Sequence, residues 1–369
     1  MIVGFSAVAR NPGPPETAPD SAWLVMRAPY PQAPAPNRGP ATLAPLLRLP
    51  DHWLWDSWIA DDGERYHLFY LQAPRALGDG GLRHAAATIG HASSTDLTRW
   101  EVHEDALLPE AGRWDDLALW TGSAVREDDG SWRLFYTALS SAPGHGLRDQ
   151  RIGLAESDDL RTWRRVGDRP LLDPDPRWYA TLDEDPAASE TWRDPFVFRG
   201  DGDWHMLICA RARGVPRLRA GVLAHARSGD LRTWELGPPL TEPAGFGQLE
   251  VPQARLVDGR PLLVFTCHPS EQSPEQVARH GPHSTWYVLG ESLTGPWDID
   301  AARPFEAEPD LFAAPLVQQR DGTWAFVGFL NREADGILSF ELIDPIPVTL
   351  RDGALRRAGG YGSPYPPRG

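Results

Sequence analysis

The sequence predicts an all-β protein, a five-bladed β-propeller with an active-site pocket on its axis. Five apolar runs with strand character follow turns that mostly contain Asp-Gly, a hairpin signal; they open at Tyr66, Trp132, Trp204, Arg260 and Trp324. A second element, a strand followed by a version of Ser-x-Asp-Leu-x-x-Trp, recurs four times and ends at Trp100, Trp163, Trp234 and Trp297. These tryptophans are 63, 71 and 63 residues apart. That period suits a four-stranded blade, and helical periodicity is nearly absent.

The repeat gives each blade an order of elements: a strand, a turn, the apolar strand, a loop, a third strand, the Asp-Leu-x-x-Trp corner, and an outer strand such as 101–108. In the corner we expect the Asp to accept backbone hydrogen bonds and the Trp to pack between blades. The fifth corner is degenerate, and 336–342 is expected to supply a strand without it. Residues 46–369 form a single propeller domain in this prediction, whereas the Pro- and Ala-rich residues 1–45 form an extended strap.

Composition narrows the class of partner. The chain has 369 residues, 41% of them hydrophobic, and a formal net charge of -15. Because this field repels polyanions, the sequence argues against nucleic acid or an anionic membrane and favours a neutral or cationic small molecule, a class that includes a small-molecule carbohydrate. The N-terminus lacks the features of a signal peptide, which predicts a cytoplasmic protein and leaves secretion after processing open. Cys209 and Cys267 lie in apolar runs and indicate buried thiols rather than a disulfide framework. The oligomeric state stays open.

Carboxylates recur at one position of the repeat. Counting ten residues back from each apolar strand gives Asp56, Gly122, Asp194, Glu250 and Ala314. Equivalent positions on the inner strands of a propeller face one axial channel, so we expect the three acids to share a pocket that the two small residues leave open. Three close carboxylates repel one another, and one of them should keep its proton near neutral pH. Cleavage of a glycosidic bond requires that combination of acid and carboxylate.

The residues around these positions carry a family resemblance. Trp-Asp-Ser-Trp at 55–58, Trp-Thr-Gly-Ser-Ala at 120–124, Trp-Arg-Asp-Pro at 192–195 and Leu-Glu-Val-Pro at 249–252 follow one another on successive blades. In this order they resemble the five-bladed glycoside hydrolases that act on fructofuranosides, the levansucrase and invertase clan. The C-terminal β-sandwich typical of invertases is missing here, which places the resemblance nearer the levansucrase type. It implies a retaining β-fructofuranosidase or fructosyltransferase that cleaves sucrose or short fructosides through a covalent fructosyl-enzyme.

The resemblance also implies roles for individual residues. Asp56 resembles the nucleophile, Glu250 the general acid/base and Asp194 the transition-state stabiliser. Trp55 and Trp120 would wall the fructosyl pocket, Thr121 would hydrogen-bond near the nucleophile, and Arg193 would bind substrate or orient the acids. His268 is a candidate contact for the leaving group.

Some positions depart from the family pattern and keep alternatives open. Thr121 stands where the family commonly has Ser, Gln248 where levansucrases tend to have a carboxylate, and Thr266-Cys267-His268-Pro269 where they usually offer an Arg. The leaving group is therefore undetermined. The alternatives are a related propeller furanosidase acting on arabinosides or xylosides, and a non-catalytic sugar-binding propeller. The sequence predicts no cofactor. Metal-ligand spacing is absent from His84, His91, His103 and His205, which we expect to be hydrogen-bonded within the protein or at the surface. Binding of calcium in an Asp-rich loop stays open.

Overall fold

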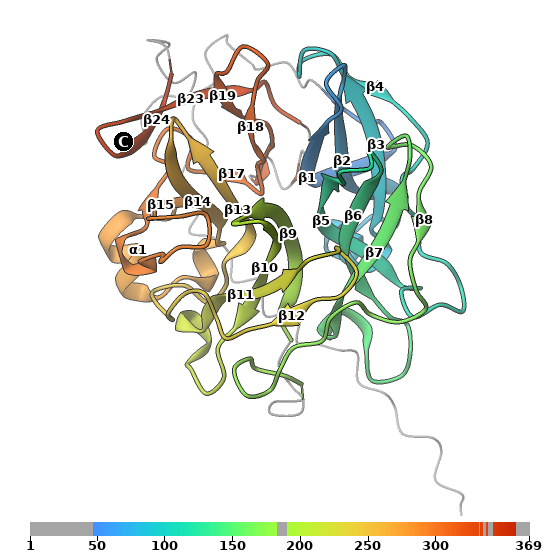
Figure 1. The fold of residues 1–369 in the computed structure, drawn as a ribbon, viewed down its shortest axis with the longest axis horizontal. Coiled ribbons are helices and arrows are strands. Elements are labelled where there is room, and N and C mark those ends of the chain that lie inside the picture. Colours follow the sequence, from blue (N-terminus) through green and yellow to red (C-terminus); the bar gives the residue numbers. More distant parts are fainter. Residues whose placement is uncertain (1–46, 183–189, 332, 335–336, 339–341, 359–369) are drawn as a thin grey trace, which may run out of the picture. The chain divides into compact units, whose positions relative to one another are not determined.

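The computed structural model describes residues 47–182, 190–331, 333–334, 337–338 and 342–358, all within one compact unit. The strap predicted for residues 1–45 lies outside the described residues. The described part is built from strands arranged as five blades around a centre (Figure 1), which confirms the predicted all-β propeller.

Four blades are four-stranded antiparallel sheets whose strands follow in chain order. Blade 1 contains β1 (His52–Asp61), β2 (Tyr66–Pro74), β3 (Thr88–Ser94) and β4 (Glu101–Val102). Blade 2 contains β5 (Ala118–Arg126), β6 (Trp132–Leu139), β7 (Gln150–Ser157) and β8 (Arg164–Arg165). Blade 3 contains β9 (Trp192–Gly200), β10 (Asp203–Arg211), β11 (Gly221–Ser228) and β12 (Glu235–Leu236). Blade 4 contains β13 (Glu250–Val257), β14 (Arg260–Thr266), β15 (Thr285–Leu289) and β16 (Arg303–Pro304).

Blade 5 is less regular. Its sheet contains β18 (Leu316–Gln318), β19 (Trp324–Phe326), β23 (Ile346–Arg351) and β24 (Ala354–Arg357). Two short pairs accompany it, β17 (Leu311–Phe312) with β20 (Phe329–Leu330) and β21 (Glu333–Ala334) with β22 (Ile337–Leu338). The α-helix of the described chain, α1 (Pro274–His280), lies between β14 and β15. The 3₁₀ segments are η2 (Arg75–Leu77), η3 (Gly80–Ala86), η4 (Gly146–Arg148), η5 (Arg217–Arg219), η6 (Pro269–Glu271) and η7 (Ile299–Ala301). None of the described helices is long and apolar enough to cross a membrane.

The predicted strand starts agree closely with the structure. Four of the five second strands begin at the predicted residue, and β10 begins at Asp203, one residue before Trp204. The outer strand of blade 1 is shorter than predicted, because β4 ends at Val102 and Leu107 makes an isolated bridge to Ile89. The strand predicted within 336–342 is present as β22, but it is not part of the four-stranded sheet of blade 5, whose third strand is β23, paired with β19. Of 336–342, 337–338 form β22, Leu342 makes isolated bridges, and the rest lies outside the described residues.

The Asp-Leu-x-x-Trp corners are structural in blades 1 to 3, as the sequence indicates. In blade 2 the carboxylate of Asp159 accepts the amides of Arg161 and Thr162, at 2.8 and 2.7 Å. The buried Leu160 that follows has φ 61°, and Leu97 and Leu231 repeat this conformation at the other two corners. Trp163 then packs edge-on against Phe69 of blade 1 at 5.7 Å. The corner therefore joins one blade to the one before it.

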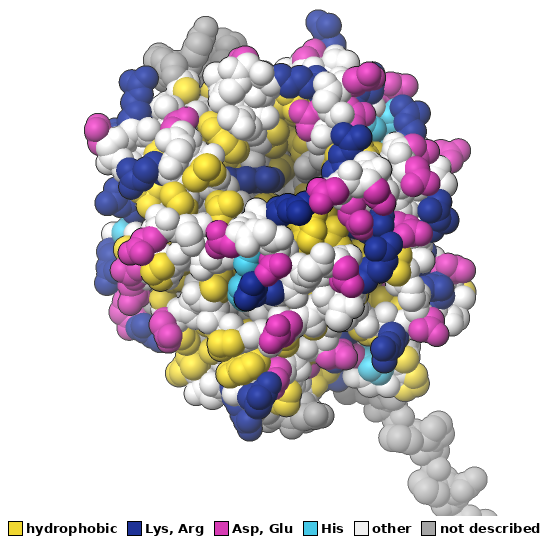
Figure 2. Space-filling model, viewed as in Figure 1, with side chains coloured by type: hydrophobic (Ala, Val, Ile, Leu, Met, Phe, Trp, Pro, Cys, Tyr) yellow, Lys and Arg dark blue, Asp and Glu magenta, His cyan; other side chains and the backbone are white. Residues whose placement is uncertain are grey.

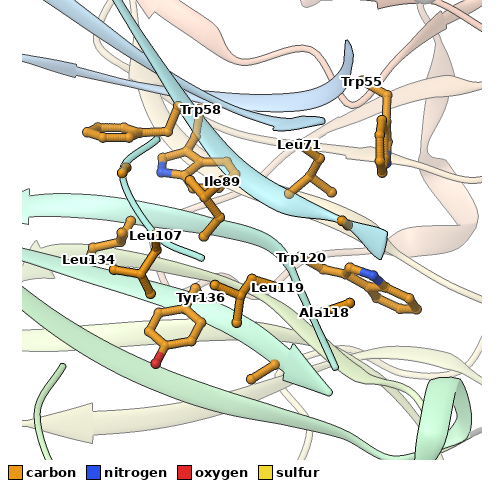
Figure 3. Packing of buried hydrophobic residues seen from close by; sticks show 14 of the residues in the cluster. Trp55, Trp58, Leu71, Ile89, Leu107, Ala118, Leu119, Trp120, Leu134 and Tyr136 are labelled. Carbon is orange, nitrogen blue, oxygen red and sulfur yellow. The ribbon is translucent and has the colours of Figure 1, made fainter. Parts of the chain in front are cut away.

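Apolar side chains fill the spaces between blades. Figure 3 shows one such cluster, in which Trp58, Leu71 and Ile89 of blade 1 pack with Leu119, Leu134 and Tyr136 of blade 2. The ring closes between blades 5 and 1, where the backbone amide of Arg320 donates to the Tyr66 hydroxyl at 3.0 Å. The guanidinium of Arg320 lies 4.2 Å from the centroid of the same ring. Cys209 and Cys267 are buried free thiols, as predicted.

Candidate active site

A β-bulge on each of the inner strands β1, β5, β9 and β13 positions the candidate site. In blade 1 Trp55 pairs with Leu71 and Ser57 with Tyr70, which leaves Asp56 without a cross-strand partner. Asp194 lies in the corresponding bulge of β9, and Glu250 directly precedes the bulge of β13. Bulges turn side chains out of the regular alternation of a strand, and they are frequent next to active sites. The three predicted acids are therefore at the irregular points of three inner strands.

Blade 2 differs from the sequence prediction by one residue. Trp120 pairs with Thr137 and Gly122 with Tyr136, so the bulged residue is Thr121 and not Gly122. A Cβ at Gly122 would lie 1.9 Å from the carbonyl oxygen of Phe135, which explains the glycine by close backbone packing rather than by space for a ligand. Thr121 is the counterpart of Asp56, and its hydroxyl donates to the Asp56 carboxylate at 2.9 Å. This contact joins blades 1 and 2 at the site.

Asp194 is held by the neighbouring blades on both sides. Its backbone amide donates to the Thr137 hydroxyl at 2.9 Å, and Thr137 in turn donates to the Thr121 carbonyl. On the other side the Val251 amide donates to Asp194 Oδ2 at 3.1 Å. Val251 is β-branched but has φ 46°, a strained conformation of the kind that gathers at functional sites. In this conformation the Val251 amide points at the carboxylate of Asp194, a residue that is 5% exposed.

Arg193 is the cation that joins two of the acids. Its guanidinium is buried and donates to Glu250 and Gln248, and also to Gln150 at 3.2 Å. Its Nε lies 3.5 Å from Asp194 Oδ2. Gln248, one of the departures from the resembled pattern, serves here as an acceptor for Arg193. The arginine thus fixes the relative positions of Asp194 and Glu250.

The three carboxyls influence one another electrostatically. Burial raises the pKa of Asp56 to about 6, and Glu250 adds to the effect, while Thr121 and Arg83 act against it. Burial likewise raises the pKa of Asp194 to about 7, opposed by Arg193 and reinforced by Glu250 and Asp56. The cluster therefore keeps a proton into the neutral range, and it does so because desolvation and mutual repulsion disfavour full ionisation.

Aromatic side chains border the acids. Trp55 and Trp120 are buried, and both pack edge-on against His84, with ring centroids 6.0 and 5.7 Å away. The Trp120 indole N–H donates to the His84 carbonyl at 2.8 Å. Figure 3 shows both tryptophans at the same side of the inter-blade cluster. The two predicted wall residues are thus brought together by η3.

The segment η3 also contributes residues that sequence reasoning missed. Arg83 lies 5.4 Å from the centroid of the Trp55 ring and is among the groups that lower the pKa of Asp56. Burial and the nearby Arg83 and Arg193 hold the pKa of His84 well below its usual range, so this histidine is neutral. Neither residue belongs to a recognisable motif, and η3 lies in the loop between β2 and β3.

His268 lies at the edge of the site, at the start of η6. Burial lowers its pKa, while Glu250 and Glu271 act in the opposite direction, which places the imidazole within electrostatic reach of the predicted acid/base. Its Nδ1 is hydrogen-bonded to the Ser270 hydroxyl at 2.7 Å. Among the described residues, no group of three or more His, Cys, Asp and Glu side chains is arranged to hold a metal ion. His91 and His205 are buried and hydrogen-bonded to His67 and His225, consistent with the satisfied role predicted for them.

Comparison with solved structures supports the fold. The inulosucrase from Halalkalicoccus jeotgali bound to kestose superposes with a TM-score of 0.68 at 23% identity, covering 89% of this chain and 92% of that one. The levansucrase of Bacillus subtilis gives 0.69 at 14% identity, with 92% and 94% covered. At these identities the likeness concerns the fold.

Sequence comparison identifies the family. A sucrose-6-phosphate hydrolase of Klebsiella pneumoniae is 35% identical over 275 residues, which are 72% of this chain and 53% of that protein. A β-fructofuranosidase, insoluble isoenzyme 1, of Oryza sativa subsp. indica is 30% identical over 211 residues, 54% of this chain and 33% of that protein. The chain thus spans about a third to a half of the length of these relatives. The family model described as the glycosyl hydrolases family 32 N-terminal domain matches residues 56–336, from the candidate nucleophile into the fifth blade. The chain therefore belongs to glycosyl hydrolase family 32.

Proposed function

We propose that this protein is a retaining β-fructofuranosidase, with transfer to sugar acceptors as a second outcome, and that sucrose or short fructosides are its substrates. The observation that carries the proposal is the convergence of Asp56, Asp194 and Glu250, in which Glu250 raises the pKa of both Asp56 and Asp194, and Asp56 raises that of Asp194. Family membership and the names of the relatives support the substrate class.

In the first half-reaction Asp56 attacks the anomeric carbon of the fructosyl unit, and Glu250 protonates the oxygen of the departing sugar. The attack needs Asp56 as a carboxylate. The Thr121 hydroxyl and the charge of Arg83 both favour that form against the effect of burial. Thr121 also fixes one carboxylate oxygen, leaving the other for the bond to carbon.

Positive charge develops on the fructosyl ring in the transition state. Asp194 is positioned to stabilise it because the Val251 amide and Arg193 fix its carboxyl before substrate arrives. In the second half-reaction Glu250 removes a proton from water or from an acceptor hydroxyl, which releases the sugar from Asp56. Hydrolysis and transfer share every residue up to this step. His268, close to Glu250, is the residue that we assign to the leaving sugar or acceptor.

The experiment that tests the proposal is incubation of the purified protein with sucrose, kestose and an arabinofuranoside. Released sugars are separated by chromatography, and the first-formed anomer is followed by NMR. We expect fructose or fructosylated products with retention, and a loss of turnover of about a thousandfold or more in Asp56→Asn and Glu250→Gln.

Matched substitutions of exposed acids control for the change of charge. Asp158→Asn and Glu110→Gln alter side chains that are 77% and 63% exposed and should leave turnover unchanged. Inverted products, or activity on the arabinofuranoside alone, would replace the proposal with a related furanosidase. Sugar binding that persists in Asp56→Asn, without turnover in the unsubstituted protein, would identify a binding module.

A further inference from the structure

The central channel continues past the acids into a cavity of about 420 Å³. Thr121, Asp194 and Val251 line both the candidate site and this cavity, so the two spaces share a wall. Register shows that the cavity extends toward the opposite ends of the inner strands. Arg126 pairs with Trp132 and Arg199 with Trp204, at the hairpins that end β5 and β9, and both arginines line the cavity. Figure 2 shows a hollow near the middle of one face in which hydrophobic and basic side chains gather.

Arg255 is the unusual residue of this cavity. It follows Glu250 by five positions on β13, and its guanidinium carbon lies 4.9 Å from the centroid of the Phe196 ring. Within the described residues it makes no hydrogen bond or ion pair, and its Nε is buried without an acceptor. Burial lowers the pKa of Arg255 to about 10, so the side chain is still charged at neutral pH. Arg255 as a whole is only partly buried, but its Nε is enclosed without an acceptor among the described residues, and in native proteins such a group often marks the place of an ion or ligand.

The other charged groups that line the cavity have polar partners, and Arg126 also has a ring contact. Arg199 forms a bidentate pair with Asp128 at 2.6 and 2.8 Å, and Asp61 pairs with Arg320 at 2.8 Å. Arg126 donates to the Gly130 carbonyl at 3.3 Å and lies over the Trp132 ring.

Asp194 borders the cavity at its catalytic end, where Arg193 accompanies it. Of the charged residues that line the cavity, Arg255 alone makes neither a hydrogen bond nor an ion pair within the described residues, in a protein whose net charge is -15.

We propose that this cavity binds a small molecule carrying an oxyanion, a phosphate or a carboxylate, with Arg255 as its principal ligand. The planar fork of a guanidinium matches both groups with two parallel hydrogen bonds, and stacking on an aromatic ring holds the fork in place. The cavity is large enough for an organic body as well as the anion. Trp58 and Phe196 in its wall offer apolar faces to such a body.

Isothermal titration calorimetry at neutral pH and constant ionic strength tests the proposal. The probes are inorganic phosphate, glucose 6-phosphate, gluconate and glucose, which separate a free phosphate, a sugar phosphate, a carboxylate and a neutral sugar. We expect at least one anion to bind in a way that depends on Arg255, whereas any binding of glucose at the candidate active site should not depend on Arg255. Arg255→Gln should weaken anion binding by about tenfold or more, and Arg255→Lys, which keeps the charge without the fork, by less.

Two further variants locate the anion. Arg164→Gln removes a charge from a side chain that is 58% exposed on β8 and should bind as the unsubstituted protein does. Glu250→Gln changes the acid cluster and should leave anion affinity unchanged. The proposal fails if no anion binds at anion concentrations up to about 10 mM, a range in which weak binding is also detected. It also fails if Arg255→Gln weakens the binding of glucose as much as that of the anions. It fails likewise if Arg255→Gln binds anions like the unsubstituted protein while its melting curve is native, or if Glu250→Gln alone alters anion affinity. The assay involves no turnover, so its outcome is independent of the proposed enzyme activity.

Discussion

Replacement of Thr121 by Val removes one hydroxyl from the candidate site and little else. Thr121 is 2% exposed, and valine has nearly its shape. The lost contact is the 2.9 Å hydrogen bond to Asp56, which favours the ionised carboxyl. A hydrogen bond to a charged group contributes about 1.5–3 kcal/mol, and one pKa unit corresponds to about 1.4 kcal/mol. The pKa of Asp56 should therefore rise from about 6 to about 7 or above.

This change predicts a loss of activity that depends on pH. Near pH 5 the ionised fraction of Asp56 falls from about one tenth to about one hundredth, whereas near pH 8 it stays at about nine tenths. The acid limb of kcat/KM should consequently move to higher pH in Thr121→Val, with about a tenfold loss near pH 5 and little loss near pH 8.

The assay is kcat/KM for sucrose measured across this pH range. Thr191→Val is a matched control, because Thr191 is also 2% exposed and its hydroxyl has no hydrogen-bond partner among the described residues. An acid limb that stays in place in Thr121→Val, or that moves in Thr191→Val as well, would refute the assignment of Asp56 as the ionising nucleophile held by Thr121.

Three other substitutions test the structure more widely. The pKa of Asp56 is raised from 3.8 to about 6 on folding, so ionisation of this carboxyl destabilises the fold as the pH rises through that window. Asp56→Asn should therefore raise Tm near pH 8 and leave it nearly unchanged near pH 4. An equal rise at both pH values would contradict this reasoning. Asp159→Ala should lower the free energy of unfolding in urea by about 1–2 kcal/mol and leave kcat/KM unchanged, since its carboxylate serves backbone amides of the corner. Gly122→Ala should destabilise the protein by about 3 kcal/mol or more, because the added Cβ would meet the Phe135 carbonyl. Gly229→Ala is the control, since a Cβ added there meets no atom within 4 Å. Equal melting curves for the two variants would show that the bulge lies elsewhere.

Much of the fold could be predicted because its signals are local. Asp-Gly turns and apolar runs located the second strands, and the corner motif encodes its own hydrogen bonds. Blade 5 was misplaced because its corner lacks the motif and its strands are short. Gly122 was misassigned for a similar reason: five residues separate Arg126 from Trp132, whereas four separate Asp61 from Tyr66. A count back from the second strand cannot detect a turn that is longer by one residue.

The candidate site was predictable where a motif lies on an inner strand and not elsewhere. Asp56, Asp194, Glu250 and Arg193 belong to such motifs. Arg83 and His84 come from η3, and Thr137 and Gln150 from β6 and β7; they reach the site through the packing of whole blades. The spacing of residues along the chain does not predict contacts between blades of this kind.

The bulges on the inner strands separate the residues that face the candidate site from the residues that pair the strands of each blade. Asp56, Thr121 and Asp194 have no regular cross-strand partner, whereas the residues beside them keep the ladder of each blade in register. A substitution at a bulge can therefore exchange a carboxylate for a hydroxyl in the channel and leave the ladder intact, as the difference between Asp56 and Thr121 already illustrates. A propeller of this kind can acquire new chemistry by point mutation while the pairing of its strands stays the same.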